Sequence, residues 1–374
     1  MKSELVSTFL SERISAGDFP SAVYLIGEKG EIRFADALGF AVKTKDVQIP
    51  AELETIYDLA SLTKPLVTGL LCAKLVERKK TLLESKINSF FNKFDCDLKR
   101  EITILDLLTH VSGFLAWYPF YFLPQTPKRK TISNFIAANL LGSMGAPKTV
   151  KYSDLNFIML GFWLEEMFGE FFHEIAKTEI FDRLKLKNTN FNPPREQQNQ
   201  IAACEFGNLY EKQTCQELGF DVESFAWRDY QIWGEVHDGN AHFLDGVAGH
   251  AGLFSTAAEV FRIAQQFLPG TTELLKPDTC RLFETNFTPG LNEARSFAFE
   301  SAATKDSTAS EALAKNSFGH LGFTGTSLWI EPGRERIFVL LTNRTHRALP
   351  FVNINSVRRR FHELAVRELA PGVS

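Results

Sequence analysis

The sequence of 374 residues has few cysteines and no long apolar segment. Its cysteines are odd in number and scattered, and no two of them form a Cys-x-x-Cys pair, which argues against a disulfide framework and against a thiolate zinc site. No stretch reaches the length of about 18 apolar residues that a membrane-spanning helix needs, so we expect no membrane span. We expect reduced and mostly buried thiols at Cys72, Cys96, Cys204, Cys215 and Cys280.

The sequence also lacks a basic block, a nucleotide-binding motif and a secretion signal. A net charge of −4 without clustered Lys and Arg gives no electrostatic footprint for a nucleic-acid partner. No GxSxG elbow, P-loop or GxGxxG turn is present, and we expect neither a cofactor nor a metal. Residues 1–20 carry charges and lack the apolar core and cleavage site of a signal peptide. We therefore expect a cytoplasmic protein, or a periplasmic one if a leader was removed.

The composition and the ends of the chain indicate a globular α+β protein. Hydrophobic residues make up 44% of the chain and charged residues 23%, and the length suits two structural units or one composite domain. Both ends carry strand patterns beside a helix. The expected elements are a helix over 3–16, a hairpin of strands 22–26 and 32–35, a hairpin of strands 326–330 and 336–341, and a helix over 351–369.

The middle of the chain has mainly helical apolar spacing from about residue 60 to residue 250. Thr256 and Glu259 fit a capping box that opens a further helix. Residues 301–317 are rich in Ala, Ser, Thr and Lys, which is typical of a mobile surface loop.

Strands at both ends with helices between them predict one antiparallel sheet built from the two termini, flanked by helices and joined to an all-α region. The sheet part is expected to comprise residues 1–58 and 290–374, and the mainly helical part residues 59–289. The active site is expected in the cleft between the two parts.

A Ser-x-x-Lys sequence opens the first helix of the middle part. Residues three apart share a helix face, so the Lys64 amine is expected within reach of the Ser61 hydroxyl. Pro65 is tolerated chiefly in the first helical turn, which fixes the helix start near Ser61. A serine hydroxyl is a weak nucleophile and needs a base beside it. Taken alone, the motif is also compatible with a capped helix start and a solvated lysine.

Tyr152 comes just before another apolar helix, for which Ser153 or Asp154 suits the N-cap. A phenol becomes a useful general base only where nearby positive charge, such as Lys64, favours the phenolate. Taken alone, such a tyrosine is more often a packed aromatic residue.

Residues 318–326 alternate glycines with polar residues and lead into a predicted strand. Such a segment lets a substrate backbone or carboxylate lie alongside it and exposes backbone N–H groups. The alternative is a strand end whose glycines serve packing, with His320 as a satisfied surface histidine.

The order and spacing of these three elements resemble the signature motifs of a known family. Ser61-Leu62-Thr63-Lys64, then Tyr152-Ser153-Asp154, then His320-Leu321-Gly322 resemble those of the serine β-lactamase and penicillin-binding-protein superfamily. The most similar branch is the class C β-lactamase-like one, with its related esterases and DD-peptidases. Flanking phrases at 106–113, 246–256 and 341–344 are similar to that branch as well, so the resemblance covers nearly the whole chain.

The resemblance implies a β-lactamase-like (DD-peptidase-like) fold and a serine hydrolase that forms an acyl-enzyme. Ser61 would attack a carbonyl of a small-molecule or peptide substrate, while Lys64 and Tyr152 shuttle its proton. The backbone N–H groups of Ser61 and Phe323 would form the oxyanion hole. The substrate-binding residues implied in this way are Asp154, His320, Leu321, Gly322 and Phe323.

Two positions depart from the family pattern. Asp154 replaces the Asn of Tyr-x-Asn, so an amide that can donate becomes a carboxylate that only accepts, and contacts to the substrate's acylamide carbonyl should weaken. His320 replaces the Lys of Lys-Thr-Gly, so a group titrating near 6.5 stands in for a permanent cation, and activity should depend on pH near 6 to 7. Both changes favour an esterase, amidase or peptidase over a strong β-lactamase.

Two other functions stay open from the sequence. His237, Asp238, His242, Asp245 and His250 lie close enough along the chain to suggest a metal hydrolase, although no His-Glu-x-x-His helix is present. A catalytically silent penicillin-binding-like protein could use the same cleft. The aromatic residues around 117–121 could line that cleft or pack in the core, and the sequence does not determine the oligomeric state.

Overall fold

The computed structural model describes the chain except for residues 79, 96, 124–126, 140–147, 348 and 371–374, so the predicted thiol of Cys96 lies outside the described residues. Within the described residues, Cys72, Cys204, Cys215 and Cys280 are buried free thiols. None of the described helices combines the length and the apolar character needed to cross a membrane.

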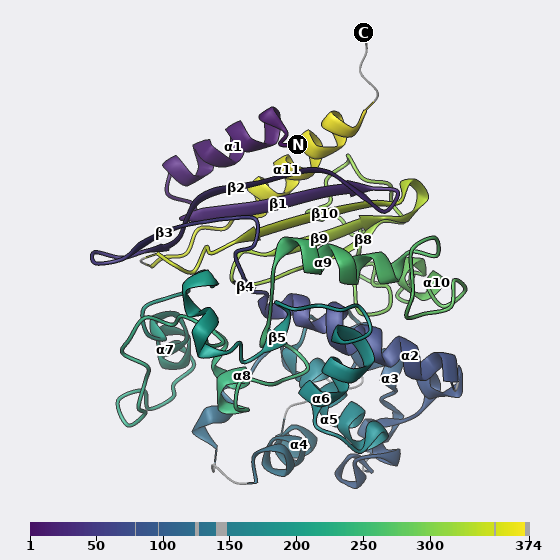
Figure 1. Cartoon of the computed structure of the whole chain (residues 1–374). Coiled ribbons are helices and arrows are strands. Elements are labelled where there is room, and N and C mark those ends of the chain that lie inside the picture. Colours follow the sequence, from purple (N-terminus) through teal and green to yellow (C-terminus); the bar gives the residue numbers. More distant parts are fainter. Residues whose placement is uncertain (79, 96, 124–126, 140–147, 348, 371–374) are drawn as a thin grey trace.

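A seven-stranded antiparallel sheet in the order β3-β2-β1-β10-β9-β8-β7 dominates the structure (Figure 1). The strands are β1 (Ser21–Glu28), β2 (Glu31–Lys43), β3 (Gln48–Pro50), β7 (Glu300–Ser301), β8 (Phe318–Leu321), β9 (Ser327–Glu331) and β10 (Arg336–Thr342). Both predicted hairpins are present, and β1 pairs with β10. The two ends of the chain therefore form one sheet, as the alternation of strand and helix patterns predicted.

Helices surround this sheet and form the rest of the molecule. They are α1 (Glu4–Ser15), α2 (Leu70–Arg78), α3 (Ile104–Leu108), α4 (Lys128–Asn139), α5 (Asp154–Phe168), α6 (Phe172–Ala176), α7 (Leu209–Glu217), α8 (Gly239–Phe243), α9 (Ala257–Ala264), α10 (Arg281–Glu284) and α11 (Asn355–Leu369). A small sheet in the order β4-β6-β5, which the sequence did not predict, lies among them. Its strands are β4 (Tyr57–Asp58), β5 (Asn190–Phe191) and β6 (Leu253–Ser255).

The two terminal helices, α1 and α11, cover one face of the large sheet (Figure 1). Leu10 of α1 and Phe361 of α11 are fully buried in the apolar cluster on this face. The predicted closing helix begins four residues later than expected, at Asn355. The Asn353 side chain accepts a 3.0 Å hydrogen bond from the Asn355 N–H, and such a local turn competes with a helix.

The segment predicted as a mobile surface loop, 301–317, runs as an irregular segment from β7 to β8, but part of it is buried against this face of the sheet. Ala309 and Leu313 are buried in the same apolar cluster. Thr308 accepts hydrogen bonds from the Trp329 indole and through its carbonyl oxygen from His362. Small side chains let this segment lie close to the sheet, which its composition alone did not reveal.

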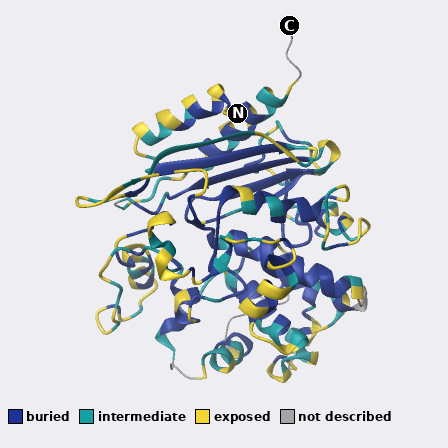
Figure 2. Cartoon of the chain, in the orientation of Figure 1, coloured by how far each residue is buried: buried dark blue, intermediate teal, exposed yellow. Residues whose placement is uncertain are grey.

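Helix α9 packs on the opposite face of the sheet, between the sheet and the helical region. A Cβ atom on Gly27 of β1 would lie 2.2 Å from the Phe261 ring of α9, so the glycine permits this approach. Only half of the predicted capping box forms. Thr256 accepts from the Glu259 N–H, whereas the Glu259 carboxylate accepts a hydrogen bond from the Thr189 hydroxyl. Buried residues, which are dark blue in Figure 2, are found both in the sheet and in the helical region on the other side of α9.

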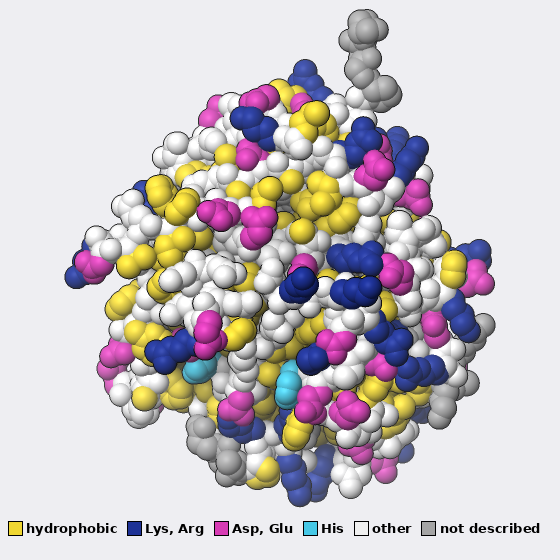
Figure 3. Space-filling model, in the orientation of Figure 1, with side chains coloured by type: hydrophobic (Ala, Val, Ile, Leu, Met, Phe, Trp, Pro, Cys, Tyr) yellow, Lys and Arg dark blue, Asp and Glu magenta, His cyan; other side chains and the backbone are white. Residues whose placement is uncertain are grey.

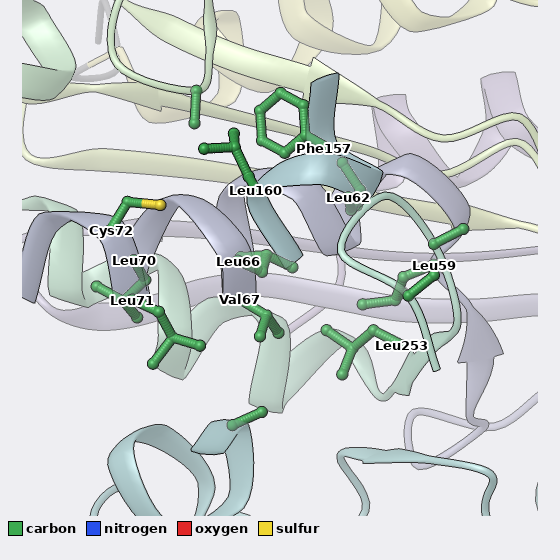
Figure 4. Close-up of a cluster of buried hydrophobic side chains, with 14 of the residues drawn as sticks. Leu59, Leu62, Leu66, Val67, Leu70, Leu71, Cys72, Phe157, Leu160 and Leu253 are labelled. Carbon is green, nitrogen blue, oxygen red and sulfur yellow. The ribbon is translucent and has the colours of Figure 1, made fainter. Parts of the chain in front are cut away.

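The helix that follows Ser61 is packed tightly against α5. Figure 4 shows apolar side chains of this helix beside Phe157 and Leu160 of α5, in a cluster of buried residues. A Cβ atom on Gly249 would lie 2.2 Å from the Phe157 carbonyl oxygen, so the backbone of this loop touches α5 directly. Burial of this apolar cluster fixes the position of Ser61 relative to α5.

Candidate active site

Ser61 lies in a tight turn directly after strand β4. The turn is a 3₁₀ segment over Ala60–Leu62, followed by a π-helical segment over Lys64–Gly69 that continues into α2. Ala60 has a φ of 47°, a left-handed conformation that costs free energy in a residue other than glycine. The Asp58 carboxylate holds the turn, because it accepts a 2.8 Å hydrogen bond from the Ala60 N–H and another from the His237 N–H.

The structure places the Lys64 amine next to the Ser61 hydroxyl, as the spacing predicted. Lys64 Nζ donates to Ser61 Oγ at 2.8 Å and to the His250 carbonyl oxygen at 3.0 Å. The Lys64 side chain is fully buried. The solvated lysine of the alternative reading is therefore wrong.

Tyr152 lies beside this pair, at the end of the loop before α5. Its ring centroid is 5.1 Å from Lys64 Nζ, and its hydroxyl makes hydrogen-bonding contact with Lys64 and Ser61. Desolvation raises the pKa of Tyr152 above its usual value, and the neighbouring Lys64 charge offsets this only in part. The resting group is a phenol and not a phenolate.

The loop that contains His110 holds Tyr152 in place. The His110 Nδ1 accepts a 3.1 Å hydrogen bond from the Ser153 N–H, and the Ala116 carbonyl oxygen accepts one of 2.9 Å from the Asp154 N–H. The His110 ring lies 4.6 Å from the Tyr152 ring, centroid to centroid. Burial lowers the pKa of His110 well below its usual value, so the imidazole is neutral. In the sequence, residues 106–113 were notable only for their similarity to the family branch, and nothing indicated that His110 contacts Tyr152.

Asp154, the first residue of α5, contacts Lys64. Its Oδ1 lies 2.7 Å from Lys64 Nζ. Burial lowers the pKa of Lys64, but the charge of Asp154 and the hydrogen-bonding contacts with Asp154 and Tyr152 outweigh burial, so the pKa is raised above its usual value. Lys64 is thus an ammonium ion in the resting site.

His320, on β8, lines the cleft near Tyr152, with 5.8 Å between the ring centroids. Its Nδ1 lies 2.9 Å from the Leu321 carbonyl oxygen, and since a carbonyl only accepts, Nδ1 carries the proton. Burial, followed by the charges of Lys64 and Arg295, lowers the pKa of His320 well below its usual value. The predicted titration of His320 near pH 6 to 7 is therefore wrong, because the environment keeps the imidazole neutral there.

The other residues of the third motif form the turn after β8. A Cβ atom on Gly322 would lie 2.6 Å from the Leu59 carbonyl oxygen, so only glycine fits so close to the turn of the nucleophile. Ser61, Leu321, Gly322 and Phe323 all line the cleft. Within the described part of the chain, the backbone N–H groups of Ser61 and Phe323 have no hydrogen-bond acceptor. These two donors stay the predicted oxyanion hole.

The cleft has a volume of about 580 Å³. Trp117 lines it, whereas Tyr118, Phe120 and Tyr121 pack in an aromatic cluster away from it. The sequence did not predict most of the polar residues that line the cleft, because they come from distant segments and only Arg344 lies in a phrase that resembles the family. They are Glu211, Arg295, Glu300, Arg344, Asn355 and Arg358.

The residues that suggested a metal hydrolase form pairs in the structure. His237 pairs with Glu205 at 2.9 Å, and His250 pairs with Asp238 at 3.0 Å. Asp245 contacts the Lys128 amine. Among the residues with described positions, no three His, Cys, Asp or Glu side chains gather as a metal-binding group. The paired residues instead hold the loops around Ser61 and Lys64.

A serine beside a buried lysine, in a cleft that residues of β8 and α5 also line, is the site of a serine hydrolase of β-lactamase-like fold. The Beta-lactamase family model matches residues 6–360. The chain therefore belongs to the Beta-lactamase family, and it is a serine hydrolase.

The matches to named relatives also cover most of the chain. The N-acetylmuramyl-L-alanine amidase of Bacillus subtilis (strain 168) is 29% identical over 360 residues, which cover 90% of this chain and 79% of that protein. An Escherichia coli (strain K12) protein described as "Putative D-alanyl-D-alanine carboxypeptidase" is 29% identical over 374 residues, covering 90% and 81%. The structure of a class C β-lactamase from Rhodobacter sphaeroides has a TM-score of 0.73 at 18% identity, covering 98% of this chain and 100% of that one. This last likeness shows the same fold.

Proposed function

We propose that the chain hydrolyses a peptide or amide bond through an acyl-enzyme on Ser61, with esters as further substrates. The observation that carries this proposal is the 2.8 Å contact between Ser61 Oγ and the buried Lys64 Nζ at the cleft. In the first half-reaction, Ser61 Oγ attacks the substrate carbonyl and the N–H groups of Ser61 and Phe323 bind the developing oxyanion. Tyr152 then gives a proton to the leaving group.

The substrate proposed here has a free carboxylate on its leaving group. Arg344 and Arg358 line the cleft and donate hydrogen bonds to neutral oxygen atoms, such as the carbonyls of Phe323 and Gly322. Neither arginine has a carboxylate partner among the described residues. A substrate carboxylate would pair with this uncompensated positive charge. His320 is neutral, so it offers no cation for that carboxylate. The names of the amidase and carboxypeptidase relatives favour the same kind of bond.

Covalent labelling tests the nucleophile. The protein and its Ser61→Ala variant are incubated with a fluorophosphonate and, separately, with penicillin, and their intact masses are measured. We expect an adduct on the unaltered chain only. No adduct from either reagent would replace this proposal with the catalytically silent binding protein.

Paired substrates test the carboxylate. An N-acylated D-alanyl-D-alanine peptide and its C-terminal carboxamide differ only in the charge that the arginines would bind. We expect a higher kcat/KM for the acid, and a loss of this preference in Arg358→Gln. Equal kcat/KM values for the two peptides would contradict the carboxylate part of the proposal and leave the serine hydrolase intact.

A cytoplasmic location, or a periplasmic one after loss of a leader, stays a prediction.

A further inference from the structure

Three oxygen atoms surround the Lys64 amine in the active site. Ser61 Oγ lies 2.8 Å from Nζ, the His250 carbonyl oxygen 3.0 Å and Asp154 Oδ1 2.7 Å. The lysine side chain is fully buried, and the Asp154 side chain is only 18% exposed. The Tyr152 hydroxyl also contacts the amine, so polar groups enclose Nζ.

The His250 carbonyl oxygen and the Asp154 carboxylate can act toward Lys64 only as acceptors. A backbone carbonyl and a carboxylate only accept hydrogen bonds, so the His250 oxygen accepts an N–H of Lys64, and Asp154 meets the amine as an ion-pair partner. An asparagine at position 154 could turn its NH₂ group toward an unprotonated amine, whereas an aspartate cannot. Asp154 is also the first residue of α5, where the helix dipole favours a negative charge. The carboxylate and the ammonium therefore stabilise each other.

The proton of Ser61 must still go to some group when the serine attacks. The ammonium of Lys64 has no lone pair, and one of its N–H groups donates to Ser61 Oγ. Tyr152 retains its own proton, since desolvation raises its pKa more than Lys64 lowers it. Among the described groups in contact with Lys64, the Asp154 carboxylate is the one with an open position for a proton.

We propose that Asp154 receives the serine proton through Lys64. In this step one proton moves from Lys64 Nζ to Asp154 Oδ1 while the proton of Ser61 moves to Nζ and Oγ bonds to the substrate carbonyl carbon. Lys64 stays an ammonium, Asp154 becomes a carboxylic acid, and the negative charge passes from Asp154 to the oxyanion. As the intermediate collapses, Tyr152 gives its proton to the leaving group, Lys64 passes a proton to Tyr152, and Asp154 returns its proton to Lys64. This inference rests on the proposed acyl-enzyme function.

The test compares the pH dependence of acylation in three variants. The rate of Ser61 labelling by a fluorophosphonate is measured from pH 6 to pH 10 for the unaltered chain, Asp154→Asn and Asp154→Glu. Asp182→Asn is the matched control, because Asp182 forms an exposed 2.7 Å pair with Lys177 away from the cleft. Circular dichroism of each variant reports whether it is folded.

In the unaltered chain and in the control, the rate should change little between pH 6 and pH 9. Asp154→Asn removes the proton acceptor and the counter-ion, so burial should then lower the pKa of Lys64, and the rate should fall at pH 6. It should rise about tenfold per pH unit as Lys64 loses its own proton. Asp154→Glu keeps a carboxylate, and it should keep a flat profile at a reduced rate.

If the labelling rate depends on pH in the same way in Asp154→Asn and in the unaltered chain, the inference is overturned. Ser61-dependent labelling would still support the proposed function in that case. Absence of Ser61-dependent labelling in the unaltered chain would instead overturn the proposed function. If Asp154→Asn does not fold, nitrogen NMR of lysine-labelled protein decides, with Lys64→Arg used for assignment. A Lys64 signal typical of an ammonium at pH 9 supports the inference, and a signal typical of an amine at pH 8 overturns it.

Discussion

Glu211, on α7, should make the protein less stable as the pH rises above the ordinary pKa of a carboxyl group. Its side chain is buried at the edge of the cleft, where Oε1 accepts a 2.7 Å hydrogen bond from the Gly239 N–H. Burial, and next the nearby carboxylate of Asp238, raise the pKa of Glu211 from 4.5 to about 7. Asp238 itself is held as an anion by its contact with His250.

The direction in which stability changes with pH follows from the number of protons that the folded and the unfolded state bind. In the unfolded chain this carboxyl loses its proton near pH 4.5, but in the folded protein it does so only near pH 7. Between these values the folded state binds more protons than the unfolded state, so the free energy of unfolding falls as the pH rises. The interval from 4.5 to about 7, at about 1.4 kcal/mol per pH unit, corresponds to about 3 kcal/mol that is present below pH 4.5 and lost by pH 7.

Urea unfolding at pH 5 and at pH 8 measures this contribution. Glu211→Gln keeps an oxygen that can accept from Gly239 but does not ionise, so it should remove most of the 3 kcal/mol difference. Glu217→Gln, at an exposed position of the same helix, should follow the unaltered chain at both pH values. If Glu211→Gln and the unaltered chain lose the same free energy between the two pH values, within the error of extrapolation, the reasoning from burial is refuted.

Three further results are expected. In Gly249→Ala the new Cβ would meet the Phe157 carbonyl oxygen, so urea unfolding should show a loss of about 1–3 kcal/mol, and unchanged stability would contradict the tight packing against α5. Lys64→Met leaves the Asp154 carboxylate without its cation and should cost about 3 kcal/mol in the same assay, whereas a gain in stability would refute the ion-pair argument. His320→Gln should leave the shape of the acylation profile between pH 6 and pH 7 unchanged, since His320 is already neutral there, and loss of an inflection would show that it titrates.

The sequence predicted the terminal elements because short-range rules determine them. Strand pairs joined by a tight turn and an amphipathic helix that stops before Gly17 are set by residues close together in the chain. For residues 301–317 the composition indicated an irregular segment, but it did not indicate that this segment lies against Trp329. The closeness of Ser61 and Lys64 was predictable for the same reason as the helices, because the two are three residues apart.

The charge states in the active site depend on tertiary structure alone. Asp154 meets Lys64 only because α5 packs against the helix that follows Ser61, and neither sequence segment indicates that contact. His320 is neutral because the surrounding protein excludes water and places Lys64 and Arg295 nearby. On the face drawn in Figure 3, acidic and basic side chains are interspersed.

The sequence by itself determined the local elements, the position of the nucleophile at a helix start and, through its resemblance to a family, the kind of reaction. Only the tertiary structure decided which groups surround Lys64, which protonation states are favoured and which arginines line the cleft. The physical reason is that backbone patterns depend on neighbours a few residues away. Burial and electrostatic interactions instead depend on segments that are close in space and distant in the chain.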